Sequence, residues 1–264
     1  MTKQIIICFS ILFSGCTQEL KNKNIPSTPV WVEKSRPEDL DERGIDAHNM
    51  NLISPDKNSI KLAWHPNPEE DIWKYHLYRT DVVDEENFPT DFSIILTTEI
   101  DTLFYDEEVF RYVEFYYYLI AENFDGIKSA TSDTISYKLL KKPSAFTTSD
   151  SIQSISLQFH WLDHQYGSHI PSYYAVKIEN EFGHGVWGCL FLNPNFLNNG
   201  EPVSFSFSLN GTDCVEYEGI DDYLEPGRYF WKIKALRLGN GIATSADHDI
   251  ASAESNWVEI NIID

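Results

Sequence analysis

The chain has 264 residues, of which 42% are hydrophobic and 14% aromatic. This is enough apolar material for two ordinary cores of roughly 100–130 residues each, which excludes a disordered chain. The formal net charge is −21, from 20 basic and 41 acidic side chains, and this excess opposes binding to nucleic acid or to an anionic membrane surface through a basic patch.

The N-terminus begins with an apolar run over residues 5–13. Such a run is too short to span a bilayer as a helix, and it is typical of the hydrophobic part of a secretory signal. The sequence Phe13-Ser14-Gly15-Cys16 that follows resembles the lipobox of bacterial lipoproteins, although Phe13 replaces the usual leucine. The resemblance implies a lipoprotein signal peptide over residues 1–15 and lipid attachment at Cys16. The alternatives are an ordinary cleaved signal and an apolar start with a buried Cys16.

Residues 16–27 are mostly polar and are predicted to form a flexible tether. Acyl chains contribute roughly 0.8 kcal/mol per buried methylene, so the two or three chains implied by the resemblance anchor a protein without a transmembrane helix. The expected location is therefore the bacterial cell envelope, at the outer membrane, with the folded part facing either the periplasm or the outside.

Short strands separated by turn signals are predicted over residues 28–140. The candidate first strand is 29–32, a polar, turn-rich stretch covers 37–58, and further strands are predicted at 59–64, 73–79, 92–97, 102–106, 115–121 and 134–140. In the stretch 115–121 an aromatic or aliphatic side chain stands at every position, so both faces are apolar and the strand is predicted to be central.

The motifs of this unit stand in a fixed order: Leu-x-Trp at 62–64, Tyr-x-Leu-Tyr-Arg at 75–79, Phe-Tyr-Asp at 104–106, the strand 115–121 and Asp-Gly at 125–126. This order resembles a fibronectin type III domain. The resemblance implies a seven-stranded, immunoglobulin-like sandwich of two antiparallel sheets without catalytic residues of its own. The corner tyrosine of the family is replaced by Phe115, so its hydrogen bond is expected to be absent or supplied by a neighbour such as Tyr112.

A second unit is predicted over residues 141–264, after a short polar joint at 141–144. Its motif Leu-x-Pro-Gly-x-Tyr-x-Trp-x-Ile-x-Ala at 224–235 again resembles fibronectin type III, with Tyr229 at the corner position. The strand around Trp231 has one apolar and one charged face, which predicts a half-buried strand. A single last strand is expected to close the sheet at 252–260, and extra length around 163–170 and 184–213 predicts enlarged loops or an extra strand.

Cys189 and Cys214 both fall in the second unit. An exported location permits a disulfide between them, and closing a loop of about 25 residues stabilises by roughly 3.5 kcal/mol on the chain-entropy model. The alternative is two buried thiols, because spacing alone does not show that the two residues approach each other.

No nucleophile elbow, phosphate loop, dinucleotide fingerprint or Cys-x-x-Cys pair is present in the sequence. The densest ionisable cluster comprises His160, Asp163, His164 and His169, but its spacing matches no known set of metal ligands. The acidic runs at 69–71 and 84–86 lack the alternation and glycine of a calcium loop. We therefore expect a non-enzyme without metal, cofactor or catalytic residue, and the histidine cluster stays as the alternative of an unrecognised active site.

The candidate ligand face is the outer face of the first unit, formed by His76, Tyr78, Tyr116 and Tyr118. If Tyr75 points into the core, its neighbours point outward, and the family resemblance places these four rings beside one another. Such an amphipathic patch suits sugar stacking or a protein partner. The alternative is a set of cross-strand pairs that stabilise the sheet or pack on the second unit.

Together these features predict an all-β protein with two tandem fibronectin type III-like sandwiches after a lipoprotein signal and a tether. The expected function is that of a non-catalytic, lipid-anchored protein that serves as a protein-binding, adhesion or spacer module. The alternative is a carbohydrate-binding accessory protein for glycan processing. The expected partners are the membrane, through the lipid, and an unidentified protein or glycan, but no nucleic acid.

Overall fold

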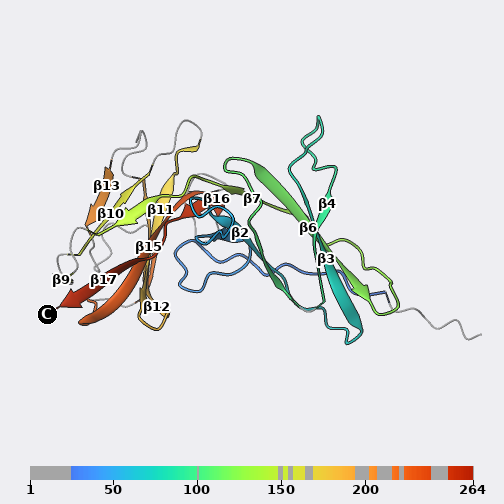
Figure 1. The fold of residues 1–264 in the computed structure, drawn as a ribbon, viewed down its shortest axis with the longest axis horizontal. Coiled ribbons are helices and arrows are strands. Elements are labelled where there is room, and N and C mark those ends of the chain that lie inside the picture. Colours follow the sequence, from blue (N-terminus) through green and yellow to red (C-terminus); the bar gives the residue numbers. More distant parts are fainter. Residues whose placement is uncertain are drawn as a thin grey trace, which may run out of the picture.

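The computed structural model describes residues 25–99, 101–147, 151–153, 157–163, 169–193, 202–206, 216–219, 223–238 and 249–263. Within these ranges the chain is built from β-strands and contains no α-helix (Figure 1). No helix in this part of the chain is long and apolar enough to cross a membrane. The predicted signal peptide, Cys16 and most of the predicted tether lie outside the described residues.

The first domain consists of two facing antiparallel sheets. One has the order β1-β2-β5, and the other continues through β7-β6-β3-β4. The bounds are β1 Asp46–His48, β2 Ser59–Ala63, β3 Ile72–Thr80, β4 Ser93–Thr98, β5 Leu103–Asp106, β6 Glu114–Asn123 and β7 Ile135–Leu139. The predicted first strand makes a single bridge between Trp31 and Trp64 at the edge of the smaller sheet. All six further strands predicted in this unit are therefore present.

The core of the first domain follows from the two-residue alternation of its strands. On β6, Phe115, Tyr117, Leu119 and Ala121 are buried, while Tyr116, Tyr118 and Ile120 are partly exposed on the other face. The Tyr117 hydroxyl donates a hydrogen bond to Asp106 Oδ2 at 2.9 Å. In this strand a buried tyrosine hydroxyl therefore makes its hydrogen bond from Tyr117. The sequence analysis had named Tyr112 as the neighbour that could replace the hydroxyl missing at Phe115.

The second domain repeats the two-layer arrangement with a larger sheet. Its smaller sheet has the order β13-β10-β8, and its larger sheet contains β14-β12-β11-β15, with β16 and β17 both paired to β15. The bounds are β8 Ser144–Phe146, β9 Ser151–Gln153, β10 Gln158–Leu162, β11 Tyr173–Asn180, β12 Gly185–Leu192, β13 Pro202–Ser206, β14 Glu216–Gly219, β15 Gly227–Leu238, β16 Asp249–Glu254 and β17 Val258–Ile263.

The single last strand expected in this domain is in fact two strands. Val258–Ile263 pairs with the first half of β15, and Asp249–Glu254 pairs with its second half. This is possible because β15 is 12 residues long, which is more than either partner can cover. The corner tyrosine is confirmed, since the Tyr229 hydroxyl donates to the backbone oxygen of Glu225 at 3.0 Å.

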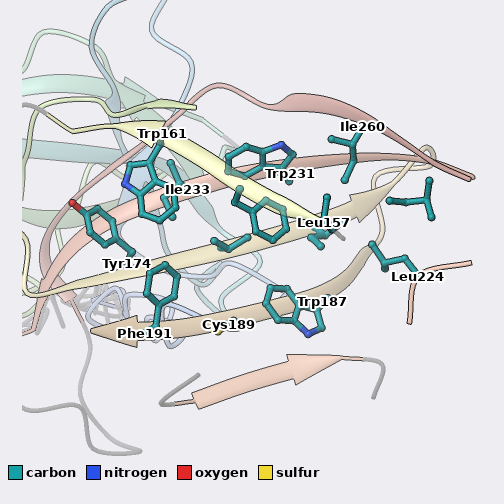
Figure 2. Close-up of a cluster of buried hydrophobic side chains, with 14 of the residues drawn as sticks. Leu157, Trp161, Tyr174, Trp187, Cys189, Phe191, Leu224, Trp231, Ile233 and Ile260 are labelled. Carbon is teal, nitrogen blue, oxygen red and sulfur yellow. The ribbon is translucent and has the colours of Figure 1, made fainter. Parts of the chain in front are cut away.

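The core of the second domain lies between β10 and the larger sheet. Figure 2 shows Trp161 beside Tyr174 and Phe191, with Trp187 and Trp231 farther along the same layer. Trp161 contacts Tyr174 and Phe191 edge-on, with its ring centroid 5.1 Å from that of Tyr174 and 6.0 Å from that of Phe191. The alternation predicted from the sequence is therefore confirmed in this domain as well.

The two domains share one sheet. β7 of the first domain pairs in parallel with β16 of the second, so that Lys138 lies opposite Ala251 and Leu139 opposite Ser252. The amide of Leu140 continues this ladder with a hydrogen bond to the oxygen of Ser252 at 2.9 Å. In Figure 1 the first described residues, in blue, reach the end of the first domain remote from the second, and the C-terminus lies at the opposite end of the molecule.

Candidate functional site

The predicted ligand face brings two of its four residues into direct contact. Tyr78 and Tyr118 are cross-strand partners on β3 and β6, and their rings stack with centroids 4.6 Å apart and an interplanar angle of 16°. Phe92 packs against the Tyr118 ring at 4.7 Å. Ile94, opposite Tyr78 on β4, is 50% exposed beside this group. We call Tyr78, Phe92, Ile94 and Tyr118 the aromatic patch.

His76 does not belong to the aromatic patch. Its ring is 7% exposed and lies between Thr97 Oγ1, at 3.0 Å, and Glu122 Oε2, at 2.8 Å. The hydrogen bond from His76 lowers the pKa of Glu122, which is also paired with Lys74. The imidazole is thus committed to a polar chain across three strands rather than open to a ligand.

Tyr116 lies on the same face of β6 but opposite Thr80 of β3 and Ser136 of β7. It is half-buried, and polar side chains flank it rather than the stacked pair. The four predicted residues therefore occupy one sheet face without forming one continuous set of rings.

A second candidate site, which the sequence analysis did not predict, lies where the first domain meets the larger sheet of the second. Eight charged side chains come together there, four lysines and four carboxylates. Three belong to the N-terminal segment of the first domain and five to strands of the second: Lys34, Glu42, Asp46, Lys177, Lys232, Lys234, Asp249 and Glu254. We call this group the junction charges.

The junction charges are arranged around two carboxylates from the first domain. Glu42 Oε1 accepts from Lys177 Nζ at 2.6 Å and lies 2.9 Å from Lys232 Nζ. Asp46 lies 2.6 Å from Lys234 Nζ and 3.2 Å from Lys34 Nζ. Since the lysines and carboxylates are equal in number, the group is neutral overall, although the first domain contributes one net negative charge and the second one net positive charge.

The remaining two carboxylates come from β16. Lys232 Nζ lies 2.9 Å from Glu254, and Lys34 and Lys234 both approach Asp249, at 3.2 and 3.6 Å. The Tyr137 hydroxyl donates to Asp249 and also contacts Ser252 Oγ at 2.7 Å. Buried charges that are paired and hydrogen-bonded in this way tolerate removal from water, whereas a single unpaired one does not.

Burial and neighbouring charges shift the pKa values of these groups in different directions. Burial alone raises the pKa of Glu42, but the charges of Lys232 and Lys177 outweigh it and hold that pKa well below its usual range. Burial and the nearby charge of Glu42 raise the pKa of Glu254 to about 7. Glu254 Oε2 has no hydrogen-bond partner among the described residues, in keeping with a carboxyl group that protonates easily.

The interpretation of the strand around Trp231 as half-buried was wrong. Its inward face is confirmed, but Lys232 and Lys234 on the other face are also buried, at 5% and 1% exposure. The cover is the stretch 33–48, most of which fell in the part expected to be polar loop. The sequence contained a hint of this contact, because Glu38, Glu42 and Asp46 place a negative charge at every fourth position and Lys232 and Lys234 are positive. Charge alone does not show which segments meet.

A glycine on β12 permits this close approach. A Cβ atom at Gly188 would lie 2.4 Å from the backbone oxygen of Glu38. The amide of Leu40, in the same segment, donates to Glu218 Oε2 of β14 at 2.9 Å. The N-terminal segment is thus held against the second domain by backbone contacts as well as by the junction charges.

Cys189 is disulfide-bonded and lies in the core of the second domain (Figure 2). The other three cysteines, including Cys214, lie outside the described residues. The pairing of Cys189 with Cys214 therefore stays a prediction.

The described members of the histidine cluster contact different partners. His160 stacks on Phe146 at 5.8 Å, and His169 stacks on Tyr112 of the first domain at 4.1 Å. Asp163 is buried and accepts from the Tyr174 hydroxyl at 2.8 Å, while His164 lies outside the described residues. The part of the chain that the structure describes contains no group of three residues able to hold a metal ion.

No protein-family model and no curated protein matches the chain. Among solved structures, it is similar to an Fn3-like protein from Clostridium thermocellum, at 18% identity over 43% of this chain and 92% of that one, with a TM-score of 0.29. It is also similar to a two-domain fibronectin type III segment of chicken tenascin, at 14% identity over 88% and 97% of the two chains, with a TM-score of 0.26. The chicken interferon gamma receptor alpha chain gives 10% identity over 90% and 99%, with a TM-score of 0.30.

The fold class follows from the strand order itself. In the first domain, one sheet contains β1, β2 and β5, and the other contains β4, β3, β6 and β7. This is the seven-stranded arrangement of a fibronectin type III domain, and the second domain repeats it with additional strands. The protein is therefore an all-β protein with two tandem sandwiches of this class.

Proposed function

We propose that the protein is a non-catalytic, lipid-anchored spacer and binding module of the bacterial cell envelope, at the outer membrane. The observation that carries the proposal is the junction between the domains, where a continuous sheet and the eight junction charges, six of them buried and two partly buried, join them. Tandem domains connected only by a linker move relative to each other by default, unless their interface is extensive.

The junction supports rigidity for an energetic reason. Rotation of one domain against the other separates Glu42 from Lys177 and Lys232 and separates Asp46 from Lys234, which leaves these largely buried charges without their partners across the junction. Breaking one buried pair costs about 3–5 kcal/mol, and here several pairs break together. The two domains therefore move as one body, with the second held at a constant distance from the start of the folded chain.

The anchor part of the proposal is supported by the Phe13-Ser14-Gly15-Cys16 sequence, which lies just before the folded chain. A lipid on Cys16 places the membrane at the end of the first domain where the described chain begins, remote from the second domain (Figure 1). The second domain is then the part presented away from the membrane.

Carbohydrate binding is the second candidate function, since the aromatic patch lies on an outer sheet face. Sugar stacking needs an open ring face, and Tyr118 already has Tyr78 and Phe92 against it. The contacts therefore favour cross-strand stabilisation of the sheet over a sugar platform, and the spacer is the better supported of the two functions.

The spacer proposal is tested by the distance between spin labels on the mature chain 16–264 carrying Cys16→Ser. Labels at Ser93→Cys on β4 and Glu259→Cys on β17 occupy exposed strand positions in the two domains. We expect one narrow distance distribution by double electron–electron resonance, and a broad one after Glu42→Lys. Glu181→Lys, at an exposed hairpin, is the matched control, and a broad distribution in the unaltered protein would overturn the proposal.

A further inference from the structure

The two ends of the large sheet differ in a way that bears on function. The sheet ends at β14 in the second domain and at β4 in the first. β14 carries two glutamates, Glu216 and Glu218, whereas β4 has the sequence Ser93-Ile94-Ile95-Leu96-Thr97-Thr98, without a charge or a proline. Charged side chains and proline are the usual protection of an edge strand against pairing with another chain.

The outer edge of β4 is open within the described part of the chain. β4 pairs with β3 on one side, and no described strand pairs with the other. Three of its six side chains, Ser93, Ile94 and Thr97, are exposed. An unpaired edge presents backbone donors and acceptors in a row, which a further extended strand can satisfy.

β4 has one protective feature, a register shift opposite Leu77 and Tyr78. Such a bulge twists an edge and limits how long a ladder it can form. The strand remains six residues long, which is an ordinary length for pairing. The aromatic patch, of which Ile94 is a member, flanks the edge with apolar surface for alternate side chains of an added strand.

An acidic hairpin arm extends from this edge. Residues 81–91 contain five acidic side chains and no basic one. The arm continues the β3–β4 hairpin, since Val83 bridges Pro89 and the amide of Thr90 donates to the oxygen of Val82. Most of its residues are exposed, including the acidic Glu85 and Glu86, and it leads through Asp91 and Phe92 into β4.

We propose that the open edge of β4, together with the acidic arm, is a docking site for an extended, basic segment of a partner protein, which adds to the sheet as a further strand. Backbone hydrogen bonds to β4 supply the affinity, the apolar surface beside Ile94 accepts β-branched side chains, and the arm selects lysine or arginine by charge. A second copy of this chain is a poor occupant, because two chains that each carry a net charge of −21 repel each other. The site is independent of the anchor and of the rigid junction.

The test uses a synthetic nonapeptide of alternating lysine and valine and the Cys16→Ser chain 16–264. Two related peptides separate the contributions: one with glutamate in place of lysine, and one with N-methyl groups on alternate backbone amides. We expect the lysine–valine peptide to bind and to slow hydrogen exchange of the β4 amides. The glutamate peptide and the N-methylated peptide are each expected to bind at least about tenfold more weakly.

Variants of the protein locate the site. Ile94→Lys on β4 is expected to weaken binding at least about tenfold, whereas Ile250→Lys, at a similarly exposed isoleucine of β16, leaves it unchanged. The pair Glu85→Lys and Glu86→Lys is expected to weaken binding of the lysine peptide. The pair Glu181→Lys and Glu225→Lys changes the net charge equally at exposed sites elsewhere and is the control.

Four results would overturn the proposal. These are no binding of the lysine peptide, binding that N-methylation does not reduce, equal losses in the variants and their controls, and dimerisation of the unaltered chain that Ile94→Lys abolishes. The last result assigns the edge to a second copy of the chain. Unchanged circular dichroism and thermal unfolding of each variant establish that a loss of binding is not a loss of folding.

Discussion

Lys234 and Asp46 lie 188 positions apart in the sequence, yet their charged groups are 2.6 Å apart and their side chains are 1% and 2% exposed. The pair joins β15 of the second domain to β1 of the first. The pair holds the N-terminal segment against the surface of the second domain. The stability of the junction therefore depends on both charged groups being present.

The first prediction concerns that pair. Lys234→Met leaves Asp46 and Asp249 buried with less compensation, and we expect the free energy of unfolding to fall by about 3–5 kcal/mol in urea. Arg228→Met removes a surface pair with Glu259, in which both side chains are about half exposed, and is expected to change it by less than about 1 kcal/mol. Equal effects of the two substitutions would contradict the structural role of the junction charges.

The second prediction is a pH dependence that Glu254 controls. Its pKa is about 7 in the folded protein, above the ordinary value of 4.5. Between these values the folded state binds a proton that the unfolded state releases, so the Glu254 contribution to stability falls as the pH rises from 4.5 to 7. Urea unfolding from pH 5 to 8 is expected to show this slope in the unaltered protein and a smaller slope in Glu254→Gln.

Glu42 and Asp46 affect stability in a different pH range. Their pKa values are lowered, because the charges of the neighbouring lysines outweigh the effect of burial. Their contribution to stability is present above the unfolded values near 4 and is lost as the pH falls through the folded ones. Below pH 4.5 the free energy of unfolding of Glu254→Gln should therefore rise with pH, which is opposite to the Glu254 effect between pH 4.5 and 7. An unchanged slope between pH 5 and 7 in that variant would refute the assignment to Glu254.

The third prediction tests the backbone contact at Gly188. A Cβ at this position overlaps the oxygen of Glu38, so Gly188→Ala should displace the N-terminal segment and lower the free energy of unfolding by about 1–3 kcal/mol. Hydrogen exchange should accelerate over residues 33–48. Gly227→Ala, where the nearest atom to a Cβ is 3.5 Å away, is the control and should leave exchange in that segment unaltered.

The fourth prediction concerns the aromatic patch. Tyr78→Ala removes the ring that stacks on Tyr118 and is expected to lower stability by about 0.5–1.5 kcal/mol beyond the loss of buried area, whereas Tyr116→Ala has a smaller effect. A glycan array and a pull-down from envelope extract compare the unaltered chain with the double variant. Glycan binding that disappears in a folded double variant would favour carbohydrate binding over sheet stabilisation.

The fifth prediction concerns the anchor. Cys16→Ser should move the protein from the membrane fraction to the soluble fraction of the cell envelope and abolish its labelling with a radioactive fatty acid, because the proposal attaches the lipid to this cysteine thiol. Cys8→Ser, within the predicted signal peptide, is the control and should leave both unchanged. Membrane association that persists in Cys16→Ser without label would point to another mode of attachment.

The sequence by itself determined the two sandwiches, because the strands around Tyr117 and Trp231 repeat apolar side chains at the two-residue period that any half-buried strand requires. It also determined the corner at Tyr229, where a local hydroxyl-to-backbone bond spans four residues. Only the tertiary structure decided what lies on the other face of each sheet. Periodicity states that Lys232 and Lys234 share a face, but the burial of that face depends on a carboxylate segment almost 190 residues earlier in the chain. Contacts between strands also decide which of the predicted ligand residues join the aromatic patch. His76 is hydrogen-bonded to Glu122 and lies outside the patch, whereas Tyr78 stacks on Tyr118 and belongs to it.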